Sequence, residues 1–161
     1  MRVRFLGVAA GAAVLGSSLL TGCGTDLAGF ADRADAACAK AGRTIDRLAI
    51  TGDTSAGTAT AALRTALDRY KVIELLISEL TESARPGGAD GRAIEDNWLD
   101  PARRSLAERQ SDLLALSHAV RDGDDARVPE LADLASRAGV DGVDAGYLGD
   151  NGMPACAALF A

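Results

Sequence analysis

Apolar residues recur at steps of three and four from Phe30 onward, and this spacing limits the possible folds more than any other feature. In an α-helix such steps place side chains on one face, whereas a half-buried strand needs strict alternation. Alternating runs rich in Val, Ile, Thr or aromatic residues are missing from the sequence. The sequence therefore predicts an all-α fold.

Clusters of turn-forming residues divide this pattern into four helical segments. The clusters are Thr51–Gly57, Arg85–Gly91 and Asp122–Asp125. The helical segments that they separate run from Phe30 to Leu48, from Leu63 to Leu80, from Ile94 to Val120, and onward from Val128.

The second segment has the widest apolar stripe of the four. Val72, Leu75 and Leu76 add to residues that already follow the helical spacing. We expect this helix to be the most buried element of the fold.

Pro101 leaves one detail of the third segment open. It follows Asp100, so a new helix could start there with Asp100 as N-cap, or the proline could kink a longer helix.

The end of the fourth segment is also undefined. Gly139, Gly142 and Gly146 each disfavour a helix interior by about 1 kcal/mol relative to alanine. The tail from Gly149 to Ala161 is predicted to be a loop that carries Cys156.

The N-terminal residues have the layout of a secretory signal. Arg2 and Arg4 precede an uncharged apolar run that ends in Leu20-Thr21-Gly22-Cys23. This ending resembles the lipobox of bacterial lipoproteins. The resemblance implies that Cys23 receives a diacylglyceryl group and becomes the first residue of the mature chain, and two acyl chains anchor a protein stably.

Two other interpretations of this segment are weaker. An uncleaved transmembrane helix from about Phe5 to Leu20 would be short and interrupted by glycines and serines. Ordinary secretory cleavage needs an Ala-x-Ala-like site, and none lies between Leu20 and Phe30. We therefore expect an exported, lipid-anchored protein on the outer face of the cell membrane. Its parts would be a signal peptide (1–22), a lipidated tether (23–29) and one helical domain (30–161).

With Cys23 lipidated, Cys38 and Cys156 are the remaining thiols, and they would meet an oxidising compartment. We expect a disulfide between them, with two free buried thiols as the alternative. Four helices running up, down, up and down bring the end of the fourth beside the start of the first, whereas three would leave these cysteines too far apart to be bridged. The predicted fold is an antiparallel up-down four-helix bundle clipped by one disulfide.

The acidic composition excludes one class of partner. The 161 residues contain 17 Lys and Arg against 23 Asp and Glu, and removing residues 1–22 with Arg2 and Arg4 takes the formal net charge from -6 to -8. Binding to a phosphate backbone needs clustered basic residues. We therefore expect no nucleic-acid partner.

The whole mature chain resembles a loose group of small helical lipoproteins from high-GC Gram-positive bacteria. The shared marks are Ala34-Asp35-Ala36-Ala37-Cys38, Trp98, Arg121-Asp122-Gly123-Asp124, and Gly146-Tyr147-Leu148 followed by Cys156. The group's usual spacing between its Gly-Leu and terminal cysteine is stretched in this chain. The resemblance implies a disulfide-clipped bundle and implies no activity.

Two places in the sequence hold residue types that can carry chemistry. His118 is the only histidine, and its neighbours Ser117 and Asp112 are helix residues without the strand-to-helix turn of a nucleophile elbow. The acidic turn Asp122–Asp125 lacks the central glycine and terminal glutamate of a calcium loop. We expect no catalytic residue, no metal and no cofactor.

Aromatic and charged residues suggest two further features. Trp98 and Tyr70 could line an apolar pocket between helices, although plain core is the more common role. Charged residues of the second and third segments could face each other as solvent-exposed ion pairs: Glu74, Glu79 and Glu82 with Arg92, Arg103, Arg104 and Arg109.

The sequence thus favours a non-enzymatic interaction or structural module of the cell envelope, whose protein partner it does not identify. The alternative is a carrier or sensor that binds a small apolar ligand between the helices. A carrier needs a cavity of a few hundred Å³, whereas an interaction module can have a filled core and an exposed apolar patch.

Overall fold

The computed structural model describes residues 26–51, 59–136 and 140–161. Its elements are α1 Leu27–Thr51, α2 Ala59–Glu82, α3 Gly88–Ile94, the π-helical segment η2 Glu95–Leu99, α4 Asp100–Asp122, α5 Val128–Ser136, α6 Ala145–Asp150 and α7 Pro154–Phe160. These three ranges contain no β-strand, so the predicted all-α class is confirmed.

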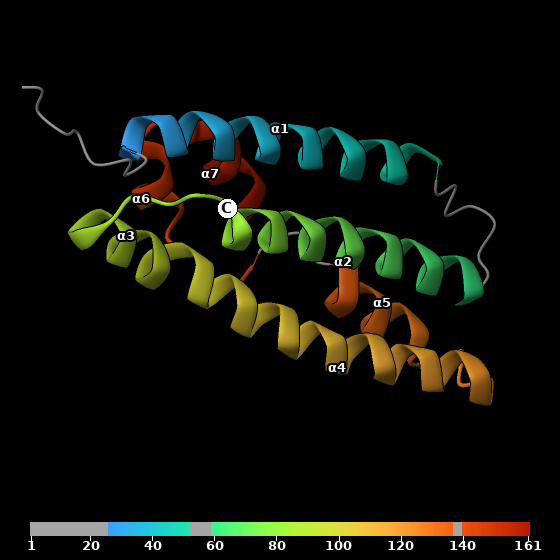
Figure 1. Ribbon diagram of the computed structural model, residues 1–161. Helices are drawn as coiled ribbons and strands as arrows, with labels where there is room; N and C mark the ends of the chain where they lie inside the picture. The colour runs from blue at the N-terminus through green and yellow to red at the C-terminus, as the bar shows by residue number, and fades with distance from the viewer. Residues whose placement is uncertain (1–25, 52–58, 137–139) are drawn as a thin grey trace, which may run out of the picture.

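Three long helices form the body of the molecule (Figure 1). α1 packs along α2, α2 packs on α4, and successive long helices run in opposite directions. α5 packs against α2 and α4, while α7 packs against α1 and α6. The chain therefore returns from the end of α4 to the start of α1 in short helical pieces.

The larger hydrophobic core joins α1, from Phe30 to Ile45, to the C-terminal half of α2, to η2 and to α7. Trp98 of η2 is fully buried there, and its ring packs edge-on against Phe30 and Phe160, with ring centroids 6.3 and 6.1 Å away. Such T-shaped pairs are electrostatically favoured over face-to-face stacking. A second core, which includes Leu116 and Leu131, joins α2, α4 and α5.

The predicted fourth helix is present only in part. α5 begins at Val128 as expected and ends at Ser136, and residues 137–139 lie outside the described part of the chain. The prediction of a loop from Gly149 onward is wrong, because α7 and the end of α6 occupy most of that tail. Helices this short make fewer than two turns, so apolar periodicity does not reveal them. A regular four-helix bundle is not confirmed.

Asp35 and Cys38, one turn apart on α1, attach α7 to α1. The predicted disulfide between Cys38 and Cys156 is confirmed, with their Cα atoms 5.0 Å apart. One carboxylate oxygen of Asp35 accepts hydrogen bonds from the backbone N–H groups of Ala155 (2.6 Å) and Cys156 (3.2 Å) at the start of α7. Since N–H groups in a first turn have no partner within their own helix, Asp35 serves as a cap supplied by another element.

Pro101 lies inside one continuous helical run formed by α3, η2 and α4. No separate start precedes it, because Leu99 and Asp100 both have right-handed helical backbone angles. Proline has no N–H to donate to the carbonyl of Asn97, four residues earlier. That carbonyl accepts a hydrogen bond from the backbone N–H of Asp144 instead (2.9 Å). Because of the proline, the carbonyl of Asn97 is free to bind Asp144, and this hydrogen bond attaches the segment between α5 and α6 to the long helical run.

α2 is less buried than its sequence predicts. Ile73, Ile77 and Leu80 are buried, but Leu67 is 46% exposed and Leu75 is 58% exposed. The apolar arc of α2 is wider than the surface that α1, α4 and α5 cover, so the apolar residues that led us to expect the most buried helix are in part exposed.

The predictions for the N-terminus fall outside the described residues, as does most of the turn Thr51–Gly57. These N-terminal predictions are the signal peptide 1–22 and lipidation of Cys23. α1 begins at Leu27, before the expected Phe30, and the carboxylate of Asp26 caps it by accepting from the N–H of Gly29 (2.7 Å). Among the described helices, none has the length and apolar character needed to cross a bilayer.

Candidate functional site

The interior beside Tyr70 is filled. A cavity of about 10 Å³ lies there, lined also by Ile73, Leu106 and Val140. That volume holds about one water molecule at most, far less than a small organic ligand needs. Trp98 packs between the rings of Phe30 and Phe160 instead. In the described part of the chain, Trp98 and Tyr70 therefore do not line a common pocket.

The open space of the molecule lies on the surface around the C-terminal half of α2. One groove, of about 760 Å³, runs between α1 and α2. Its apolar lining comes from both helices, and charged side chains border it. The apolar residues are Ala37, Ala41, Val72, Leu75 and Leu76, and the charged ones are Lys40, Glu79 and Glu82.

A second groove, of about 390 Å³, lies on the other side of α2, toward α4. Tyr70, Ile77 and Leu106 give it an apolar lining, and Arg103 lies among its polar residues. Burial raises the pKa of the Tyr70 hydroxyl, and the nearby carboxylate of Glu74 adds to that shift. The tyrosine therefore stays neutral and offers a hydroxyl group rather than a charge to this groove.

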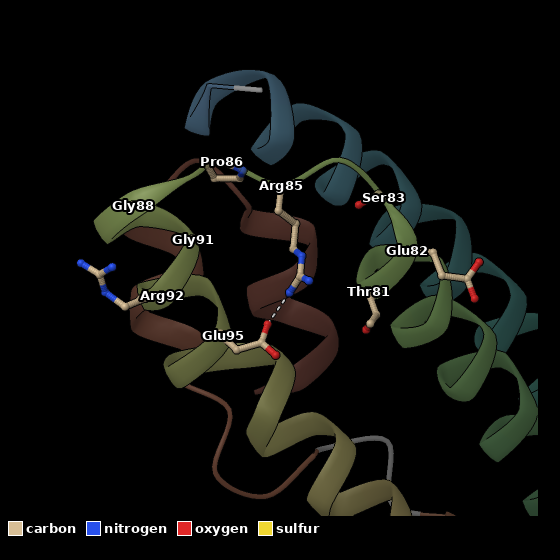
Figure 2. A pocket seen from close by; sticks show the side chains of 9 residues that line it. All are labelled: Thr81, Glu82, Ser83, Arg85, Pro86, Gly88, Gly91, Arg92 and Glu95. Carbon is tan, nitrogen blue, oxygen red and sulfur yellow. Dashed lines mark hydrogen bonds and ion pairs between the residues drawn. The ribbon is translucent and has the colours of Figure 1, made fainter. Parts of the chain in front are cut away.

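A third groove, of about 730 Å³, lies where α2 ends and α3 begins (Figure 2). Arg85 and Glu95 point toward each other across it and form an ion pair, whereas Arg92 is turned away from them. The close turn at this place needs glycine, since a Cβ atom at Gly91 would lie 2.3 Å from the backbone oxygen of Pro86. Because Arg85 and Glu95 form an ion pair, these two charges inside the groove neutralise each other.

Glu95 joins this groove to a wider network of ion pairs. Arg103 donates to Glu95 (2.7 Å), to Asp100 (2.6 Å) and to the hydroxyl of Thr81 (3.3 Å). The hydrogen bond from Arg103 is the main cause of a lowered pKa of the Glu95 carboxyl; partial burial opposes it, and the charges of Arg103 and Arg85 add to it. This network fastens the end of α2 to η2 and α4.

An exposed row of α2 side chains separates the groove along α1 from the groove along α4, and we name this row the α2 ridge: Lys71, Leu75, Ser78, Glu79 and Glu82. Leu75 and Glu79 form part of the wall of the groove along α1. Ser78 and Glu82 line both grooves. Sequence analysis did not find this surface, although the over-wide apolar stripe of α2 was a signal for it. The ridge with its grooves is the candidate functional site.

The sequence-based candidates for chemistry remain isolated. His118 is exposed, and its Nδ1 atom lies 2.8 Å from a guanidinium nitrogen of Arg121. Arg121 also pairs with Asp122 (2.9 Å), and this hydrogen bond is the main cause of a lowered pKa of the Asp122 carboxyl. Within the described residues, no three His, Cys, Asp or Glu side chains cluster in a way that could hold a metal ion.

The predicted pairing of Glu side chains on α2 with Arg side chains on α4 takes a different form. Arg103 finds its carboxylates at Glu95 and Asp100, both in its own helical run. Glu82 accepts a hydrogen bond from Ser78, one turn earlier on α2 (3.3 Å). Glu74, Glu79 and Glu82 of α2 line the two grooves on either side of that helix.

Comparison with protein-family models, with curated proteins and with solved structures finds no match to this chain.

Proposed function

We propose that this chain is an exported bacterial lipoprotein that acts without catalysis, by binding another protein at the outer face of the cell membrane. The lipid anchor would be attached at Cys23, and the acidic helical domain would lie close to the bilayer. Basic residues Arg2 and Arg4, the apolar run and the Leu20–Cys23 ending support the export and the anchor. As part of this proposal, α1, α2, α4 and the segmented return through α5 to α7 correspond to a four-helix bundle whose last helix is interrupted.

One observation carries the interaction role: the α2 ridge exposes Leu75 at the edge of a groove with an apolar lining, a second such groove lies on the other side of α2, and the cavity beside Tyr70 in the interior is nearly filled. Exposed apolar surface of this kind, bordered by charged residues, is typical of protein contact sites. A ligand carrier would instead surround its ligand.

A small apolar ligand remains the second candidate because of one measurement. The groove between α1 and α2 has a volume of about 760 Å³, which is within the usual range of ligand sites. Binding of a fluorescent fatty acid that is lost in Leu75→Glu and retained in Leu114→Glu would favour this second function.

The anchor is tested with Cys23→Ser in cells that make the full chain. We expect loss of labelling by radioactive fatty acid and loss of the protein from the membrane fraction. Normal labelling of the variant would contradict the lipid anchor at this position.

The interaction role is tested separately by placing a photo-crosslinking amino acid at position 75 of the full chain in living cells. Leu114 on α4 is the matched control, because both leucines are 58% exposed. We expect position 75 to capture protein and position 114 to capture little. Equal capture at both positions would contradict a contact surface on α2.

A further inference from the structure

We propose that the α2 ridge docks against the same ridge of a second copy of this chain, in an antiparallel pairing centred on Leu75. This pairing rests on the proposed function and deepens it, since it names the partner of the contact surface. The shape and the charge pattern of α2 both support it.

The shape of this surface allows the ridge of one copy to enter a groove of another copy. The ridge stands between the groove along α1 and the groove along α4, and both grooves have apolar linings. Two helices pack when the ridge of one enters a groove of the other. A two-fold axis repeats this contact, so that each copy receives the other's ridge and Leu75 becomes buried at the centre.

A two-fold axis at Leu75 also brings unlike charges together. In an antiparallel pair, a residue that precedes the axis faces the residue that follows the axis by the same number of positions in the other copy. Lys71 precedes Leu75 by four positions and Glu79 follows it by four, and residues at this spacing share a helix face. Lys71 of each copy would therefore face Glu79 of the other, which gives two equivalent ion pairs.

Both charged residues are available for such pairs. Lys71 and Glu79 are exposed, and neither forms an ion pair with another residue of the described ranges. Lys71 and Glu79 thus supply one set of complementary charges for a contact between two copies.

The same geometry predicts a weak dimer. Asp68 precedes Leu75 by seven positions and Glu82 follows it by seven, so these like charges of the two copies lie on the same side of the contact. They lie about two turns from the axis, where two helices that cross at about 50° have already separated, so they add no contact. One helix face buries less than the roughly 1,200 Å² of total surface that marks stable complexes. Both copies are acidic, so long-range charge opposes association. Pairing would therefore depend on chains concentrated on one membrane.

The test uses the full chain carrying Leu75→Cys in cells that export it, with a mild oxidant added. Because the two-fold axis passes at this position, the two new cysteines would lie close enough to form a disulfide between copies. We expect several-fold more dimer on a non-reducing gel than from Leu114→Cys, the control with equal exposure. A dimer yield no higher than that of the control would overturn the pairing.

Charge exchange gives a second readout that misfolding cannot imitate. In the Leu75→Cys background, Lys71→Glu and Glu79→Lys alone should each lower the dimer yield several-fold, because each creates like-charge contacts. The double variant should recover most of the yield, since the ion pairs form again with reversed sign. Failure to recover, with wild-type circular dichroism, would overturn the proposed register.

The outcomes separate this pairing from the proposed function. Photo-crosslinking from position 75 to a protein of different mass, without dimer, would overturn self-docking and leave the interaction role standing. Normal fatty-acid labelling of Cys23→Ser would overturn the anchor and leave the disulfide result at position 75 standing. If the anchor is lost in Cys23→Ser, the dimer yield of Cys23→Ser/Leu75→Cys should fall, because the chains are then no longer concentrated on one membrane.

Discussion

At the scale of single residues, Glu95 lies between two guanidinium groups, those of Arg85 and Arg103. Its side chain is 29% exposed, so solvent screens these pairs only in part. Since the pKa of Glu95 is lowered in the folded chain, mainly by the hydrogen bond from Arg103, folding favours its ionised form. The carboxylate therefore stabilises the fold at neutral pH.

Glu95→Gln should lower the free energy of unfolding by about 1 kcal/mol at pH 7. The stabilisation by the wild-type residue is present above the pKa of an unperturbed glutamate, 4.5, and is lost as pH falls through the lower pKa of the folded chain. The difference between variant and wild type should therefore shrink below about pH 4 in urea titrations.

Glu108 on α4 provides the control for this experiment, because it is exposed and takes part in none of these pairs. Glu108→Gln should change the free energy of unfolding little at any pH. A Glu95→Gln effect that stays constant from acid to neutral pH would show that packing, and not charge, is what the substitution removes.

At the scale of helices and their ends, α7 depends on a side chain from α1. Asp35→Ala removes the acceptor for two backbone N–H groups at the start of α7, whose own N-cap position, Met153, makes no side-chain cap. We expect a loss of about 1 to 2 kcal/mol in the free energy of unfolding, measured by urea denaturation.

Asp32→Ala is the matched control for Asp35→Ala, because Asp32 lies one turn earlier on the same helix and is exposed. It should have little effect on stability. If both alanine variants lose the same stability, helix propensity or net charge would explain the result, and the cap would contribute nothing of its own.

The helices differ in how well their sequences predict them. The long helices α1, α2 and α4 were predictable, because each repeats its apolar stripe over many turns. α6 and α7 were not, since their stability comes from contacts such as Asp35 with α7, which join residues far apart in the chain. The continuous helix at Pro101 was not predictable for the same reason. The carbonyl of Asn97, which the proline leaves without a helical donor, accepts from the backbone N–H of Asp144, more than forty residues later.

The candidate site was predictable only indirectly. Leu75 belongs to an apolar stripe that predicts burial, and the stripe alone does not tell which of its residues a neighbouring helix leaves uncovered. Glu95 gave no signal of its own, because its two arginine partners lie ten residues before it and eight residues after it. Only the folded chain brings these charges together.

At the scale of the whole molecule, the disulfide closes a loop between residues separated by 118 positions. A cross-link over so long a loop restricts the unfolded chain strongly, and the entropy model gives about 4 to 5 kcal/mol for it. The double variant Cys38→Ser/Cys156→Ser should therefore lose about 4 kcal/mol in urea denaturation, a large fraction of a typical domain's stability.

Reduction gives an independent measurement of the same quantity. Reductant should lower the melting temperature of the wild-type chain and leave the double variant unchanged. A wild-type melting curve that does not respond to complete reduction would contradict a stabilising cross-link.

The position of Cys38 near the start of α1 also has a mechanical consequence. A pull on the N-terminal end of the domain can unravel α1 only as far as Cys38, where the force passes through the sulfur–sulfur bond into α7. Because the force leaves α1 at Cys38, the part of α1 beyond Cys38, which packs along α2, stays folded. A tethered chain under tension would thus keep its exposed face intact while its first turns yield.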